Sequence, residues 1–170
     1  MSHTTILHVY PNDKVEWGEE LSNSWGSAPY IWDFMIKKYI RPDGNIMYSK
    51  DAEALWKLWN REDIPAYYRV VLMMTFDRFY VLKENYKRAA NDIRDFLKDY
   101  DDKKIVNHWH HIADVLESNP DVPAIGLWCT SVSDNPFNGE WDEEKEEHAP
   151  PNWEDCHEVY DVLDGEKVIQ

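Results

Sequence analysis

Cysteine is scarce in this sequence. There are two cysteines, Cys129 and Cys156, and they do not form a C-x-x-C pair. Two are too few for the disulfide framework that stabilises many small secreted domains. The sequence also begins without the basic segment and apolar run of a secretory signal. We therefore expect a cytoplasmic protein in a reducing environment.

Long apolar runs and positive charge are scarce as well. No stretch approaches the roughly 18 uncharged apolar residues of a membrane-spanning helix. Lysine and arginine number 18 against 33 aspartates and glutamates, which gives a net charge of -15. A chain of this charge repels nucleic-acid phosphates and anionic lipid headgroups. We expect neither direct nucleic-acid binding nor membrane binding.

Two glycine-dependent catalytic motifs are missing too. The six glycines form no phosphate-binding loop, and no serine has the flanking glycines of a nucleophile elbow. The sequence therefore excludes nucleotide hydrolysis by a P-loop.

Apolar residues are sufficient for one folded core. Of the 170 residues, 43 % are hydrophobic and 14 % are aromatic, whereas disordered chains are poor in both classes. Apolar positions recur at three- and four-residue spacing, which predicts helices over residues 29–41, 49–61, 66–100 and 105–116. The third stretch is long for a compact domain, so we expect a break near residues 83–85.

Short stretches rich in β-forming residues predict strands over residues 6–10, 124–132 and 158–163, and residues 16–28 predict a loop. The whole pattern predicts a helix-dominated α+β domain with about five helices and a small sheet of two to three short strands. We expect residues 1–139 to form the core domain. Residues 140–170 form an acidic, aromatic-containing C-terminal segment that either packs on the core or stays solvated.

The C-terminal segment carries most of the excess negative charge. It holds 12 acids and two lysines, a net charge of -10. Such a run is usually a solvated segment, but it also steers a molecule toward a basic partner. Four tryptophans, Trp17, Trp25, Trp141 and Trp153, lie in predicted loops or in this segment, where they either cover the core or contact a partner.

The leading hypothesis is a non-enzymatic acidic binding protein without a cofactor. Its partner is a basic protein, for example a nucleic-acid-binding protein, and the composition is analogous to that of phage-encoded inhibitors that imitate nucleic acid. Acids supply the attraction and aromatic rings anchor the contact. The predicted partner-binding residues are Trp141, Asp142, Glu143, Glu144, Glu146, Glu147 and Trp153.

Two alternatives belong to other classes of protein. The first is a metal-assisted hydrolase that uses the helix from His108 to His111, with Asp114 one turn further on. Zinc needs three or four ligands, and the H-E-x-x-H motif is absent. The second is a self-assembling structural subunit, and the sequence leaves the oligomeric state open.

Residues 156–158 combine a thiol, an imidazole and a carboxylate, a set of groups that suggests a catalytic nucleophile. Neighbouring side chains on a strand point to opposite faces, so we do not expect these three to act together.

Overall fold

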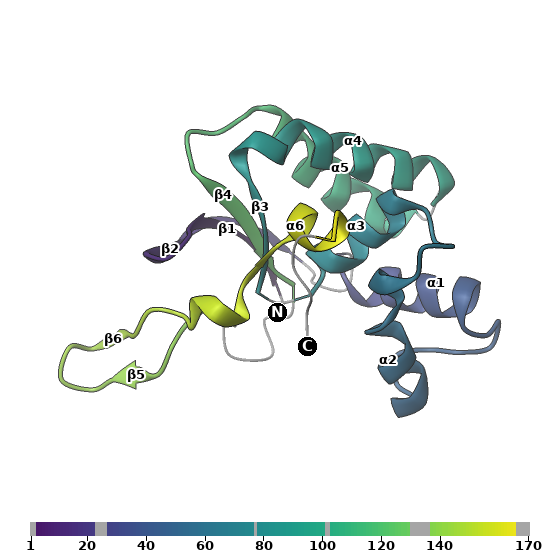
Figure 1. The fold of residues 1–170 in the computed structure, drawn as a ribbon, viewed down its shortest axis with the longest axis horizontal. Coiled ribbons are helices and arrows are strands. Elements are labelled where there is room, and N and C mark those ends of the chain that lie inside the picture. Colours follow the sequence, from purple (N-terminus) through teal and green to yellow (C-terminus); the bar gives the residue numbers. More distant parts are fainter. Residues whose placement is uncertain (1–2, 23–26, 77, 101–102, 130–136, 166–170) are drawn as a thin grey trace.

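The structure, a computed structural model, describes residues 3–22, 27–76, 78–100, 103–129 and 137–165, with the side chains of residues 103–107 left aside. The main sheet has five strands in the order β2-β1-β4-β3-β7, and helices α3, α4 and α5 lie along one side of it (Figure 1). A separate two-stranded hairpin, made of β5 (Trp141–Asp142) and β6 (Glu147–His148), projects from the body. The expected α+β class is confirmed, although the sheet is larger than predicted.

The sheet begins with a hairpin made of β1 (His3–Tyr10) and β2 (Lys14–Ser22), which pair antiparallel. At the turn, Asp13 N donates to Tyr10 O at 2.9 Å and Asn12 takes a left-handed φ of 64°. The strand predicted over residues 6–10 is confirmed as part of β1. The loop predicted from residue 16 is wrong as far as Ser22, because the chain continues there as β2.

The other strands complete the sheet around β4 (Ala124–Trp128), which pairs antiparallel with both β1 and β3 (Phe79–Leu82). The last strand, β7 (His157–Glu158), pairs parallel to β3. The strand predicted over residues 124–132 is confirmed as β4 but ends at Trp128. Residues 130–132 lie outside the described part of the chain.

Six α-helices are present within the described ranges, one more than predicted. They are α1 (Pro29–Tyr39), α2 (Ser49–Leu55), α3 (Ala66–Met74), α4 (Tyr86–Asp99), α5 (Lys103–Glu117) and α6 (Val159–Leu163). Short 3₁₀ turns follow α2 (η2, Leu58–Asn60), precede α4 (η3, Lys83–Asn85) and precede β7 (η4, Trp153–Asp155). The predicted break at residues 83–85 coincides with η3.

The continuous helix predicted before that break is wrong. Arg78 adopts a left-handed φ of 74°, a conformation that does not fit a right-handed helix. The next four residues form β3, whose residues Tyr80 and Val81 pair with Gly126 and Ile125 of β4. Aromatic and β-branched residues favour a strand when a neighbouring strand is available, so tertiary pairing overrides the helical spacing.

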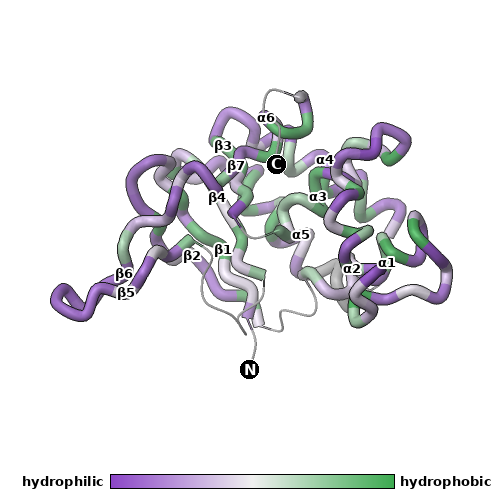
Figure 2. Tube along the Cα trace, turned by 60° about the horizontal axis from the view of Figure 1, so that its bottom comes forward, coloured by the Kyte–Doolittle hydropathy of each residue, from purple (hydrophilic) through white to green (hydrophobic). Residues whose placement is uncertain are grey.

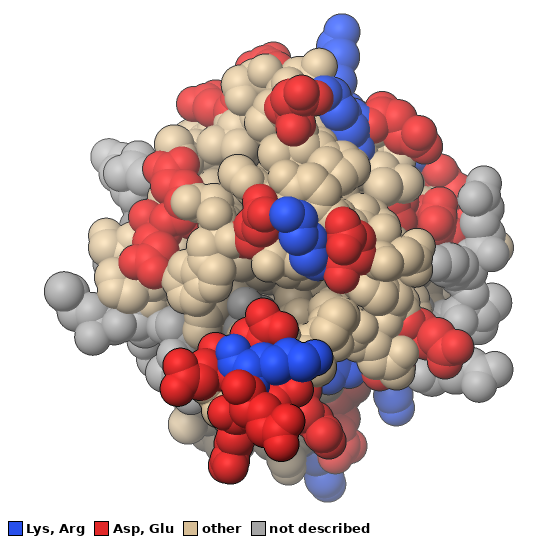
Figure 3. All heavy atoms as spheres, turned by 90° about the vertical axis from the view of Figure 1, so that its left-hand side faces the viewer, with Lys and Arg blue, Asp and Glu red and all other residues tan. Residues whose placement is uncertain are grey.

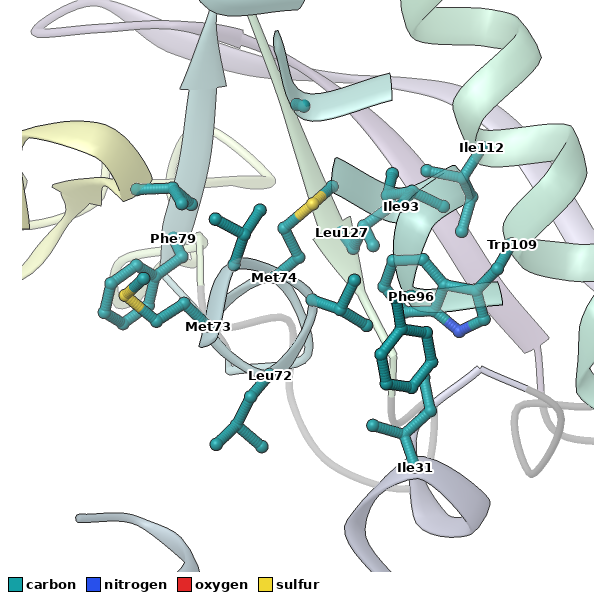
Figure 4. Packing of buried hydrophobic residues seen from close by; sticks show 14 of the residues in the cluster. Ile31, Leu72, Met73, Met74, Phe79, Ile93, Phe96, Trp109, Ile112 and Leu127 are labelled. Carbon is teal, nitrogen blue, oxygen red and sulfur yellow. The ribbon is translucent and has the colours of Figure 1, made fainter. Parts of the chain in front are cut away.

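The main core lies between the sheet and its helices. Ile6, Val81, Ile125 and Leu127 face it from β1, β3 and β4, and Trp109 of α5 is completely buried in it. Figure 4 shows side chains of α3, α4 and α5 packed together with residues of the strands. The indole of Trp109 donates to Ser27 O at 2.9 Å. Within the described ranges, no helix combines the length and apolar character needed to cross a bilayer.

A smaller cluster covers the opposite face of the sheet. Leu7, Val9 and Ala124 meet Phe137 and Cys156, which come from the C-terminal part of the chain. At Gly126 an added Cβ would lie 3.2 Å from the Phe137 ring, so the glycine allows that ring to approach the strand closely. Residues beyond 136 therefore contribute directly to the core.

Glu158 fixes the C-terminal segment to the sheet. Its side chain is 1 % exposed and accepts hydrogen bonds from Leu82 N, Asn85 Nδ2, Tyr160 N and Asp161 N. Burial raises the pKa of Glu158, while these donors act in the opposite direction. The last two donors begin α6, so the strand predicted over residues 158–163 is wrong after Glu158: its carboxylate caps a helix there.

Candidate protein-binding face

The feature that stands out from the body is the hairpin of β5 (Trp141–Asp142) and β6 (Glu147–His148), which pair antiparallel. Its base is closed by bonds from Gly139 N to Ala149 O and from Ala149 N to Glu140 O, both 2.8 Å. Figure 1 shows it extending away from the sheet, and Figure 2 shows its tip as strongly hydrophilic. We call residues 140–148 the acidic hairpin.

The turn of the acidic hairpin is held by one carboxylate. Asp142 Oδ1 accepts from the backbone N–H groups of Glu144 at 3.0 Å and Lys145 at 3.2 Å. Glu146 adopts a left-handed φ of 53°, which turns the chain into β6. The backbone therefore forms a defined turn, and the glutamate side chains around it remain exposed.

Negative charge is concentrated on this hairpin. It carries six acids and one lysine, and Lys145 Nζ lies 3.8 Å from Asp142 Oδ2. Figure 3 views the molecule from the side on which the hairpin projects, and its lower part shows a dense group of acidic side chains around a basic one. Because these carboxylates face water, they act at a distance on charged partners.

One large aromatic ring accompanies these charges. Trp141 is 53 % exposed and packs edge-on against His148, with ring centroids 5.0 Å apart. Trp153 lies in η4, is half-buried and packs against the smaller core cluster. The structure thus places the two predicted anchors differently, with Trp141 in the hairpin and Trp153 on the sheet.

Strand β2 lies on the same side of the molecule as the acidic hairpin in both Figure 1 and Figure 2. Glu16, Glu19 and Glu20 are exposed on it. Trp17 is 54 % exposed and meets Trp128 edge-on, with ring centroids 5.6 Å apart. Trp17 is one of the four tryptophans that the sequence offers as a partner contact, but its grouping with these acids on one strand was missed because residues 16–28 were predicted as a loop.

A signal for β2 was nevertheless available. The turn at residues 11–13 follows a predicted strand directly, and a strand of similar length after a tight turn is the usual partner in a hairpin. Apolar alternation is absent because only Val15 and Leu21 of β2 are half-buried, while its other residues are exposed.

The predicted histidine site is dispersed among other contacts. His111 Nε2 lies 2.8 Å from Glu19 Oε2, and Asp114 Oδ1 accepts from Arg94 at 2.7 Å. His108 is half-buried and burial lowers its pKa, while His110 is exposed. Over the residues that the structure describes, no three His, Cys, Asp or Glu side chains are arranged to hold a metal ion.

The side chains at residues 156–158 also serve separate neighbours. Burial raises the pKa of Cys156 to about 11, so its thiol stays protonated near neutral pH. Its Sγ contacts Asn152 O at 3.6 Å, while the His157 ring packs against Phe79. Glu158 is bound to backbone donors as described above, so the three groups do not form a catalytic unit.

The remaining predicted loop tryptophan, Trp25, lies outside the described residues. Trp56, within the helix predicted over residues 49–61, is 41 % exposed and packs edge-on against Trp32 and Phe76. The helix ends at Leu55, earlier than predicted, so Trp56 falls just beyond its last turn.

Comparisons of the chain with protein-family models, with curated proteins and with solved structures returned no match. Similarity therefore assigns no role to any residue of this face. The acidic hairpin and β2 are distinguished by their position, exposure and charge.

Proposed function

We propose that the protein is a non-enzymatic binding protein whose acidic hairpin engages a basic surface on a partner protein. The observation that carries this proposal is a closed two-stranded hairpin that projects from the body and leaves Trp141 and the surrounding glutamates exposed. Acids that merely increased solubility would not need a defined turn or an exposed ring beside them.

The two kinds of side chain have different roles in binding. Exposed glutamates mainly raise the association rate and select positively charged partners, because they remain solvated in the free protein. Trp141 supplies a large apolar area with few rotatable bonds, which suits an anchor at an interface. A nucleic-acid-binding protein is one class of partner with a suitable basic surface.

The proposal is tested by capturing partners from a lysate of the native host and comparing two variants of equal charge. In E143Q/E144Q/E146Q the hairpin loses three acids; in E53Q/E62Q/E84Q three exposed acids are removed elsewhere. We expect the hairpin variant to retain about ten-fold less of a basic partner, and the control to retain nearly all of it.

A salt series and W141A complete the test. Raising the salt from about 0.05 to about 0.5 M should release the partner, since screening increases strongly over that range. W141A should speed dissociation at constant salt, because it removes contact area and leaves the charge unchanged. Equal losses in both glutamine variants, or binding that ignores salt, would contradict an electrostatic role for the hairpin.

A further inference from the structure

The outer edge of the main sheet is formed by β2. In the sheet order, β2 has β1 on one side, and no strand among the described residues lies on its other side. The strand is nine residues long and seven of them are exposed. An edge of this length presents a row of backbone N–H and C=O groups that another strand can pair with.

The edge is interrupted once, near its middle. The register shifts between Ile6 and Leu7, so Trp17 lies opposite Leu7, Glu19 lies opposite Ile6, and Gly18 is the extra residue of a bulge. An added Cβ at Gly18 would lie 2.7 Å from both Ile6 O and the His8 ring. On each side of this bulge the pairing with β1 is regular, which leaves two short straight stretches of edge.

Charge determines what can occupy the edge. Glu16, Glu19 and Glu20 lie along β2. Lys14 pairs with Glu16 at 2.6 Å, and His111 Nε2 lies 2.8 Å from Glu19 Oε2. A second copy of this chain would bring the same acidic edge and a net charge of -15, and like charges placed opposite one another on paired strands are destabilising. An extended basic segment has the opposite preference, because its lysines or arginines would lie across from these acids.

The surface beside the edge favours an apolar side chain as well. Trp17 projects from β2 on the side of Leu7 and Val15, where its ring meets Trp128. In strand addition, main-chain hydrogen bonds supply affinity and pockets for alternate side chains supply specificity. The exposed face of Trp17 can receive one apolar side chain of the added segment.

We propose that β2 binds an extended, basic segment of the partner by adding it as a sixth strand to the main sheet. This inference rests on the proposed function, since it names the form in which the basic partner is recognised. The acidic hairpin then attracts the segment, and the edge of β2 aligns it through backbone hydrogen bonds.

The test uses two synthetic peptides with identical charges. The first alternates lysine and valine over nine residues, the length of β2. The second has the same sequence with an N-methyl group on every backbone amide, which removes the donors on both edges of the strand and blocks its close approach to β2 from either edge. Each peptide is titrated into the full-length ¹⁵N-labelled protein, and amide exchange is measured residue by residue.

The expected result is slower exchange of β2 amides, by about ten-fold, with the unmodified peptide alone. If both peptides bind equally and perturb only residues 140–148, strand addition is overturned while charge recognition by the hairpin stands. If neither peptide binds, strand addition is again overturned, and the salt-dependent capture experiment decides the proposed function independently. In E143Q/E144Q/E146Q the unmodified peptide should bind more weakly yet still protect β2.

Discussion

Glu158 shows how one side chain can join segments that are distant in sequence. Its two carboxylate oxygens accept from β3, from η3 and from the first turn of α6. Four donors converge on this carboxylate. An amide has an NH₂ donor in place of one oxygen, so it cannot replace the carboxylate without losing hydrogen bonds.

We therefore predict that E158Q lowers the free energy of unfolding by about 2–3 kcal/mol, because the amide NH₂ would face backbone donors and leave them unsatisfied. Urea denaturation measures this change. The control is E154Q, whose exposed side chain is nearby and whose loss should leave stability almost unchanged. Equal stability of the two variants would mean that the network around Glu158 contributes little.

Asp51 gives a prediction that depends on pH. Asp51 is 3 % exposed, and Arg41 donates two hydrogen bonds of 2.8 Å to its carboxylate. These bonds lower the pKa of Asp51 below its ordinary 3.8. A carboxyl group whose pKa falls on folding stabilises the fold above its unfolded pKa, and that contribution disappears as the pH falls through the folded value.

D51N should thus be less stable than the parent protein at neutral pH, and the difference should shrink as the pH is lowered through 3.8 and below. Urea midpoints of both proteins across this range test it. E53Q, an exposed change on the same helix, serves as the control. A difference that is constant with pH would show that packing and not charge explains the loss.

The acidic hairpin allows a prediction about a single element. At Gly139 an added Cβ would lie 2.5 Å from Pro150 O and 2.7 Å from Ala149 O, both backbone atoms. G139A should therefore open the base of the hairpin and speed amide exchange over residues 140–148, while the main sheet keeps its protection. Partner binding should weaken although every glutamate is retained. Unchanged exchange in the hairpin would show that the backbone there adapts easily.

Elements differ in how far the sequence predicts them. The helices α1, α4 and α5 follow from apolar residues at three- and four-residue spacing, because each buries one face. Strand β3 has the same spacing by coincidence and becomes a strand through pairing with β4, which no local pattern reveals. Strand β2 is exposed on most of its length, so it lacks the alternation that marks a half-buried strand.

The candidate site was also predictable only in part, because contacts between distant segments leave no local pattern in the sequence. A run of acids around Trp141 is visible in the sequence, and the structure places it on a projecting hairpin. The position of Trp153 against the sheet and the place of β2 at the end of the strand order both depend on contacts between distant segments. Sequence therefore indicates the charge of the face and not its shape.

At the scale of the molecule, the net charge of -15 opposes folding through self-repulsion. The Debye length falls from about 30 Å at 0.01 M salt to about 8 Å at 0.15 M. We expect the melting temperature to rise over this range by about 2–4 °C, the shift that corresponds to about 1 kcal/mol at this chain length. Calorimetry tests this, and E143Q/E144Q/E146Q should show a smaller rise. A melting temperature that falls with salt would mean that ion pairs outweigh repulsion.

The pairing of β1 with β4 also implies a delay during synthesis, because β1 is made long before β4. Thr5 pairs with Trp128, so about 120 residues separate the two strands. At a synthesis rate of about 5–20 residues per second, β1 waits roughly 6–24 s for the strand that lies beside it in the finished sheet. During that interval Ile6, Leu7 and Val9 have yet to meet β4. The nascent chain therefore spends seconds as a potential client for chaperones before its own sheet can close.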